Sequence, residues 1–109
     1  MARELLDDDT VERRLAGVSW RREGSSLVKS FEFEDFAASM AFVNRVADLA
    51  EERNHHPDIA ISWNRVTLRS TTHDRGGLTE LDFEIARAVD AMGTGREGLA
   101  ADRDVPFSP

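Results

Sequence analysis

Cysteine is missing from all 109 residues of the chain. A disulfide framework, a thiolate nucleophile and a cysteine-bound metal are therefore excluded. No window approaches the roughly 18 apolar residues that a membrane-spanning helix needs. The acidic N-terminus, Met1 to Asp9, also lacks the apolar core of a secretory signal. These absences predict a cytoplasmic protein that has no membrane partner.

Positive charge is also scarce, because 14 Lys and Arg face 21 Asp and Glu, which gives a net charge of −7. Binding of phosphate groups needs a surplus of Lys and Arg, so a direct nucleic-acid partner is not expected. The length suits one compact domain. A core of this size is modest, which favours oligomerisation as a source of further burial.

The apolar pattern predicts the order helix, two strands, helix, two strands, helix. Asp9 or Thr10 is expected to cap the first helix. Gly24-Ser25 separates two extended runs, which is typical of a hairpin, although Lys29 interrupts the apolar face of the second run. The central helix is expected to begin after Asp35.

The second half of the chain repeats this pattern. Ile59, Ile61 and Trp63 alternate as in a strand, and Asn64-Arg65 is interpreted as the turn that follows. Thr79 is expected to cap the last helix and Gly93 to end it. Trp63 and Trp20 are interpreted as residues of the core or of a pocket wall.

Each hairpin can pair with itself, so the sheet should be antiparallel. The sequence therefore predicts an α+β fold with a single four-stranded antiparallel sheet and three helices packed on one face, in the order α-β-β-α-β-β-α. Residues 1–93 form this domain. Residues 94–109 hold few apolar side chains and two prolines, and are expected to be a partly disordered C-terminal tail.

Three histidines, His55, His56 and His73, are the candidate catalytic residues. The first two end the central helix and the third follows the last strand, and imidazole exchanges protons near neutral pH. A histidine at a helix C-terminus is also favoured electrostatically without any function. A zinc site is a further alternative, but adjacent side chains diverge and no HExxH pair is present. A serine triad lacks its GxSxG elbow.

Several motifs together resemble the pterin-4a-carbinolamine dehydratase family. The run EERNHHPD from Glu51 to Asp58 is similar to the family's E-x-x-x-H-H-P signature, with Trp63 at its aromatic position. Thr72-His73-Asp74, followed by Gly77-Leu78-Thr79, resembles the T-H-x-x-x-G-L-[ST] segment. Asp82 matches the acidic residue that closes the signature, and Phe31 to Phe36 resembles the entry to the long helix. The resemblance covers roughly Leu5 to Met92.

This resemblance implies a hydro-lyase that dehydrates a 4a-hydroxytetrahydrobiopterin-type carbinolamine to the quinonoid dihydropterin, so that tetrahydropterin is recycled. It implies a pterin substrate, no cofactor, no metal, and a homodimer or homotetramer. His55 and His73 would form an acid–base pair, and His56 would orient the ring. The residues expected to bind substrate are Glu51, Asn54, Thr71, Thr72 and Asp74.

Two other functions remain open at this point. The same fold can serve as a non-catalytic protein-interaction or dimerisation module, or as a pterin enzyme of cofactor biosynthesis. Asp82, three residues after Thr79, is expected to form a capping box at the start of the last helix. Arg75 departs from the small residue that the family often has in this loop, and the tail after Gly93 lies outside the family pattern.

Overall fold

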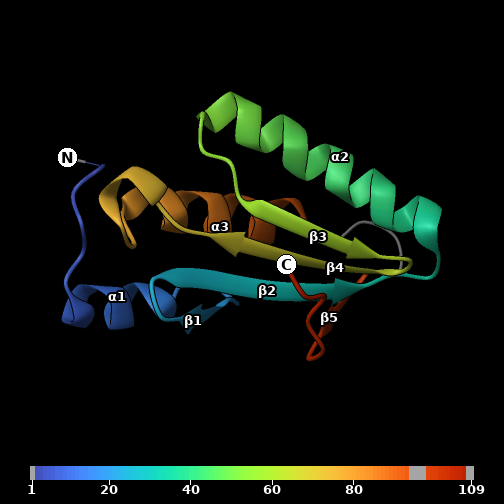
Figure 1. Cartoon of the computed structure of the whole chain (residues 1–109), viewed down its shortest axis with the longest axis horizontal. Helices are drawn as coiled ribbons and strands as arrows, with labels where there is room; N and C mark the ends of the chain where they lie inside the picture. The colour runs from blue at the N-terminus through green and yellow to red at the C-terminus, as the bar shows by residue number, and fades with distance from the viewer. Residues whose placement is uncertain (1, 94–97, 108–109) are drawn as a thin grey trace.

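The computed structural model describes residues 2–93 and 98–107. Figure 1 shows the predicted order of helices and strands, with one strand added at the end. The elements are α1 Asp8–Leu15, β1 Arg21–Glu23, β2 Ser26–Glu32, α2 Phe36–Arg53, β3 Asp58–Ser62, β4 Arg65–Ser70, the 3₁₀ turn η1 His73–Arg75, α3 Glu80–Met92 and β5 Leu99–Ala101.

The sheet is antiparallel, as predicted, with the order β1-β2-β4-β3. The expected number of four strands is wrong, because β5 pairs with β2 beside β1 and makes a fifth. Because β1 pairs only with residues 26–28 of β2, the backbone of residues 30–32 is left free on that side and pairs with β5. The predicted partial disorder concerned residues 94–109; residues 98–107 pack on the sheet, and 94–97 and 108–109 lie outside the described residues.

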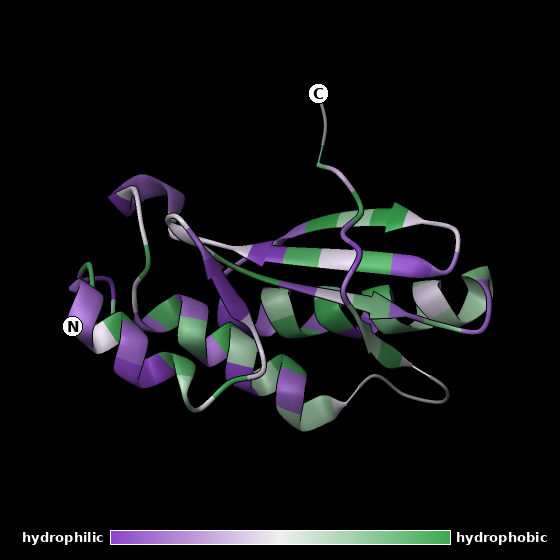
Figure 2. Cartoon of the chain, turned by 90° about the horizontal axis from the view of Figure 1, so that it is seen from below, coloured by the Kyte–Doolittle hydropathy of each residue, from purple (hydrophilic) through white to green (hydrophobic). Residues whose placement is uncertain are grey.

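All three helices lie on one face of the sheet, as predicted, and the C-terminal segment lies on the other (Figure 2). Alternation along β2 turns Leu27 and Phe31 toward the helices, where both are buried. The Phe42 ring of α2 lies 4.6 Å from the Phe31 ring, so these aromatic side chains join helix to sheet. No helix in the described ranges is long and apolar enough to span a bilayer.

Local capping signals place the helix ends. Asp35 accepts a hydrogen bond from the Ala38 N–H at the start of α2, and Asn54 ends that helix with a left-handed φ of 51°. Both features were predicted. The first helix begins earlier than expected, because Asp7 rather than Asp9 or Thr10 is its cap. Asp8 and Asp9 instead occupy the first turn, where acidic side chains favour the positive end of the helix dipole.

Lys29 interrupts the apolar face of β2 but has partners there. Its ammonium group lies 3.3 Å from the Asp90 carboxylate of α3. The same carboxylate accepts hydrogen bonds from the indole of Trp20 and from Ser19. Trp20 is only 5% exposed, so its expected place in the core is confirmed.

Trp63 is the clearest error of the sequence prediction. Its side chain is 67% exposed, and it does not line the pocket described below. The turn uses Trp63 and Asn64, one residue earlier than predicted, and Trp63 takes a left-handed φ of 51°. The residue therefore lies in the turn at the end of the edge strand β3, where Ile61 is exposed as well.

Docking of the C-terminal segment should weaken in acid. The hydrogen bond from Ser30, together with Arg21, lowers the pKa of Asp104 below its ordinary value of 3.8. A lowered pKa in the folded state stabilises the protein above that ordinary value, and this contribution disappears as the pH falls through the lowered pKa. We expect Asp104→Asn to reduce stability at neutral pH, with the difference from wild type shrinking as the pH falls below 3.8 and through the lowered pKa of Asp104.

Urea unfolding of both proteins from about pH 7 to about pH 2 measures this difference. Asp102→Asn, which changes an exposed carboxylate of the same segment, is the matched control. A difference that stays constant over the whole pH range would contradict the assignment.

Candidate functional site

The three histidines meet at one end of the sheet. The last turn of α2 and its left-handed Asn54 bring His55 and His56 to this end, where β4 also delivers residues 71–74. A cavity of about 280 Å³ lies between these two segments. The residues that line it are Arg3, Asn54, His55, His56, Thr71, Thr72, His73 and Asp74.

Asp82 is the buried acceptor behind this cavity. One carboxylate oxygen lies 2.7 Å from Nε2 of His55 and accepts the Ser70 hydroxyl at 2.6 Å. The other oxygen accepts the Thr72 hydroxyl at 2.9 Å and the Thr79 N–H at 3.0 Å. The predicted capping box with Thr79 is confirmed. Its link to His55 was not predicted, because 27 residues separate the two in sequence.

This contact determines how His55 is protonated. Asp82 is fully buried and His55 is 8% exposed, so the pair is shielded from water. A carboxylate accepts a hydrogen bond, so Nε2 of His55 carries a proton. In the neutral imidazole, Nδ1 is then the nitrogen with a free lone pair. Asp82 thus fixes both the ring position and the tautomer of His55.

His56 has a different environment. Its Nε2 lies 2.6 Å from a carboxylate oxygen of Glu51, and both side chains are more than half exposed. Glu51 precedes His55 by four positions, which in a continuous helix would place both side chains on one face. The helix ends at Arg53, so this spacing no longer applies and Glu51 meets His56 instead. Glu51 does not itself line the cavity and contacts His56, which does.

The N-terminal segment adds a residue that the sequence analysis missed. Arg3 lines the cavity and forms an ion pair with Asp74, and its hydrogen bond holds the pKa of that carboxyl below its usual value. The Leu6 N–H donates to the Leu78 carbonyl 3.0 Å away, which keeps the segment beside the loop that carries His73. No motif signals Arg3 in the sequence, because only the folded chain brings it to residue 74.

The residues after β4 lie beyond the strand, but not all of their backbone groups are free to meet a ligand. The Thr72 N–H is already engaged, since it donates to the Gly77 carbonyl at 3.0 Å. The Thr72 side chain is buried and faces Asp82, whereas the Thr71 hydroxyl donates to the Ser25 carbonyl. The His73 carbonyl accepts from the Gly76 N–H, but the exposed side chain of His73 has no hydrogen-bond partner within residues 2–93 and 98–107. Its imidazole is therefore available at the cavity.

Within the same ranges, no group of three or more His, Asp or Glu side chains lies close enough together to hold a metal ion. Two ionisable side chains near the cavity are buried, His55 and Asp82, and they pair with each other. His56 and Glu51 form a separate pair at the surface. The arrangement suits proton transfer on a small flat molecule, with imidazoles from two chain segments around one cavity.

Comparisons with known proteins agree on the kind of protein that this fold and site define. The family model described as pterin 4 alpha carbinolamine dehydratase matches residues 4–92. A relative from Thermomicrobium roseum is 53% identical over 77% of this chain and 91% of its own length. Another from Thermosynechococcus vestitus is 47% identical over 79% of this chain and 92% of its own. Both carry the name pterin-4-alpha-carbinolamine dehydratase.

Solved structures give the same picture. A transcriptional coactivator/pterin dehydratase from Brucella melitensis superposes with a TM-score of 0.77 at 30% identity, over 82% of this chain and 98% of the other. A pterin dehydratase-like protein identified as a RuBisCO assembly factor in the alpha-carboxysome superposes with a TM-score of 0.56 at 28% identity. The superposition covers 72% of this chain and 89% of the other.

Fold and pocket thus define a small α+β protein of the pterin dehydratase class. The chain belongs to the pterin-4a-carbinolamine dehydratase family, as the sequence motifs predicted. The names of its relatives support an enzyme of this kind.

Asp82→Asn tests the buried acceptor. Both carboxylate oxygens accept hydrogen bonds, so an amide NH₂ in either position faces a donor instead. We expect the free energy of unfolding to fall by about 1–3 kcal/mol. The His55 imidazole should also change its NMR signals, whereas His56 should not. Asp90→Asn, in the polar cluster near the C-terminal end of α3, controls for general destabilisation. Unchanged His55 signals would contradict the assigned contact.

Proposed function

We propose that this protein removes water from a 4a-hydroxytetrahydropterin by histidine acid–base catalysis. The observation that carries the proposal is the meeting of three imidazoles from two chain segments at one cavity. Family membership supports the pterin substrate. The product would be the quinonoid dihydropterin, and the reaction would act in the cytoplasm to recycle tetrahydropterin.

The reaction requires two proton transfers. The C4a–O bond breaks as an acid protonates the hydroxyl group, which leaves as water, and loss of the N5 proton lets the N5 electron pair form the C4a=N5 bond. His55 offers the Nδ1 lone pair that a base needs, because its Nε2–H is held by Asp82. His73, exposed at the cavity, is the acid that protonates the departing hydroxyl. General acid–base catalysis of this kind contributes typically ~10²–10⁴-fold.

Other residues at the cavity bind the pterin. His56, hydrogen-bonded to Glu51, orients the ring at the open side. Asn54, Thr71, Thr72 and Asp74 surround the remaining edges, with backbone groups of this segment meeting the amide edge of the pterin. The chemistry proposed here uses only side chains of the protein and calls for no metal or redox cofactor.

The direct test is the decay of freshly made 4a-hydroxytetrahydropterin, followed by its absorbance change. Wild-type protein should speed this decay, and His55→Ala and His73→Ala should each lower kcat by at least about tenfold, because each removes one proton transfer. His56→Ala should mainly raise KM.

Circular dichroism of each variant separates loss of catalysis from loss of folding. A wild-type rate no higher than that of buffer would contradict the dehydratase function. Full activity in His73→Ala would contradict the assigned acid while leaving the function in place.

The second candidate is a protein-interaction module of the same fold. The solved relative described as an assembly factor favours it, because that protein keeps the fold in a different role. A pterin enzyme of cofactor biosynthesis is a further alternative. An inactive protein that binds no pterin would favour the interaction module, whereas pterin binding without dehydration would favour another pterin reaction.

We also propose that the chain forms a homodimer or homotetramer. β3 is an edge strand, so one side of its backbone is open to pairing. Ile61 on this strand and Trp63 in the turn that follows it are exposed apolar side chains, and Phe36 at the start of α2 is half exposed. An edge strand with exposed apolar neighbours fits contact with a second copy.

Trp63→Asp should shift the mass measured by light scattering from oligomer toward monomer, because it places a charge at the proposed contact. Leu99→Asp is the matched control, since Leu99 is equally exposed but lies on β5, at the other edge of the sheet. A wild-type protein that is monomeric at all concentrations would contradict the proposal.

A further inference from the structure

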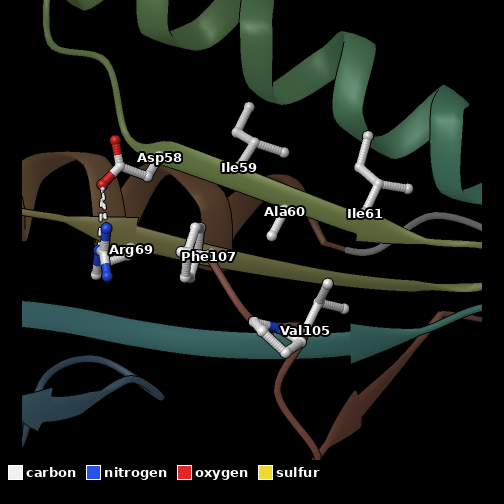
Figure 3. A pocket seen from close by; sticks show the side chains of 8 residues that line it. Asp58, Ile59, Ala60, Ile61, Arg69, Val105 and Phe107 are labelled. Carbon is white, nitrogen blue, oxygen red and sulfur yellow. Dashed lines mark hydrogen bonds and ion pairs between the residues drawn. The ribbon is translucent and has the colours of Figure 1, made fainter. Parts of the chain in front are cut away.

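Residues 104–107 cross the face of the sheet that carries no helix (Figure 3). Val105 is buried there, with 5% of its surface exposed, and its N–H donates to the Thr67 hydroxyl of β4 at 2.8 Å. The family model ends at residue 92 and the relatives match about four fifths of the chain. This docked segment therefore lies outside what the chain shares with its family.

A chain of hydroxyl groups fixes the segment to the sheet. The Ser30 hydroxyl donates to the Asp104 carboxylate at 2.5 Å, and it lies 2.7 Å from the Thr67 hydroxyl. Since Ser30 gives its proton to Asp104, Thr67 must donate to Ser30, and Thr67 can then accept from Val105. In this series of hydrogen bonds, each of the three donors, Val105 N–H, Thr67 and Ser30, has one acceptor. The segment thus has a specific docked position.

The end of the segment covers an ion pair. The Phe107 ring lies 4.3 Å from the guanidinium carbon of Arg69, in cation–π contact. Arg69 donates from Nε and Nη2 to one oxygen of Asp58, at 3.1 and 2.9 Å. The ring shields one face of the guanidinium from water, which strengthens the pairing with Asp58. Figure 3 shows Phe107 beside the Asp58–Arg69 pair.

This ion pair joins the two segments that carry the histidine pocket. Asp58 is the first residue of β3 and follows His56 by two positions. Arg69 is its register partner and directly precedes Ser70, whose hydroxyl shares an Asp82 oxygen with His55. The pair therefore connects the loop of residues 54–57, called the histidine loop below, to the end of β4 that lies at the pocket.

We propose that residues 104–107 form a strap that positions the histidine loop through Phe107, Arg69 and Asp58. The catalytic part of this inference rests on the proposed dehydratase function. None of the three side chains lines the histidine cavity, so all act as positioning residues. The strap sets the distance between the histidine loop and β4 without touching the pterin.

The test compares two replacements of one side chain in the full-length protein. Phe107→Tyr keeps an aromatic ring over Arg69, whereas Phe107→Leu keeps apolar bulk and loses the ring. We expect Phe107→Leu to lower kcat about two- to fivefold with little change in KM, the size expected for loss of one cation–π contact. Phe107→Tyr should restore the wild-type rate. Leu99→Ala, in the same C-terminal segment, should have no effect.

A second readout does not need activity. The chain has only three histidines, so its imidazole NMR signals report directly on the site. Phe107→Leu should move the signals of His55 and His56 more than that of His73, and Phe107→Tyr should leave all three in place.

The two readouts separate the two proposals. Unchanged histidine signals in Phe107→Leu would overturn the strap, whatever the rate. Shifted signals with an unchanged kcat would also overturn its positioning role. Shifted signals in a protein whose wild type does not dehydrate the carbinolamine would support the strap and reject the proposed function.

Discussion

The architecture of the pocket depends on one buried carboxylate. Asp82 accepts hydrogen bonds from His55, Ser70, Thr72 and Thr79, which belong to different parts of the chain. A buried charge is costly unless its hydrogen bonds are complete. Asp82 therefore requires the end of α2, the end of β4 and the start of α3 to come together. The same contacts stabilise the fold and orient an imidazole.

Around this acceptor the pocket is supported from two sides. The N-terminal segment brings Arg3 to Asp74, beside the loop that carries His73. On the opposite face of the sheet, the C-terminal segment places Phe107 over Arg69 and its partner Asp58. Arg3 thus contacts the neighbour of His73, and Phe107 contacts Arg69, whose ion-pair partner Asp58 follows His56 by two positions, although neither Arg3 nor Phe107 belongs to a motif. Residues outside the family signature help to determine how the signature residues are held.

The sequence predicted what local chemistry controls. Asp35, Asn54 and Thr79 mark helix ends because capping involves neighbouring residues only. The prediction was wrong at Trp63, where a shift of the turn by one residue decides whether the side chain belongs to the strand. It also missed β5, whose pairing partner β2 is distant in sequence. The meeting of His73 with His55 and His56 was inferred from the predicted hairpin, which returns the chain to the end of the central helix, and the cavity that all three line confirms it. The Asp82–His55 and Arg3–Asp74 contacts were missed because each spans a long separation in sequence.

The two ends of α2 and β3 have different tasks. At one end, Asn54 lines the histidine pocket and Asp58 pairs with Arg69; at the other, Phe36 and Trp63 are exposed. At this far end, the Asn64 carbonyl accepts a hydrogen bond from the Phe33 N–H, and the Asn64 side-chain amide donates to the Phe33 carbonyl. These contacts involve no pocket residue. The residues proposed for contact between copies, Phe36, Ile61 and Trp63, are therefore separate from those that line the histidine pocket. One set can change while the other is kept, which gives a physical route from an enzyme to a scaffold within this fold.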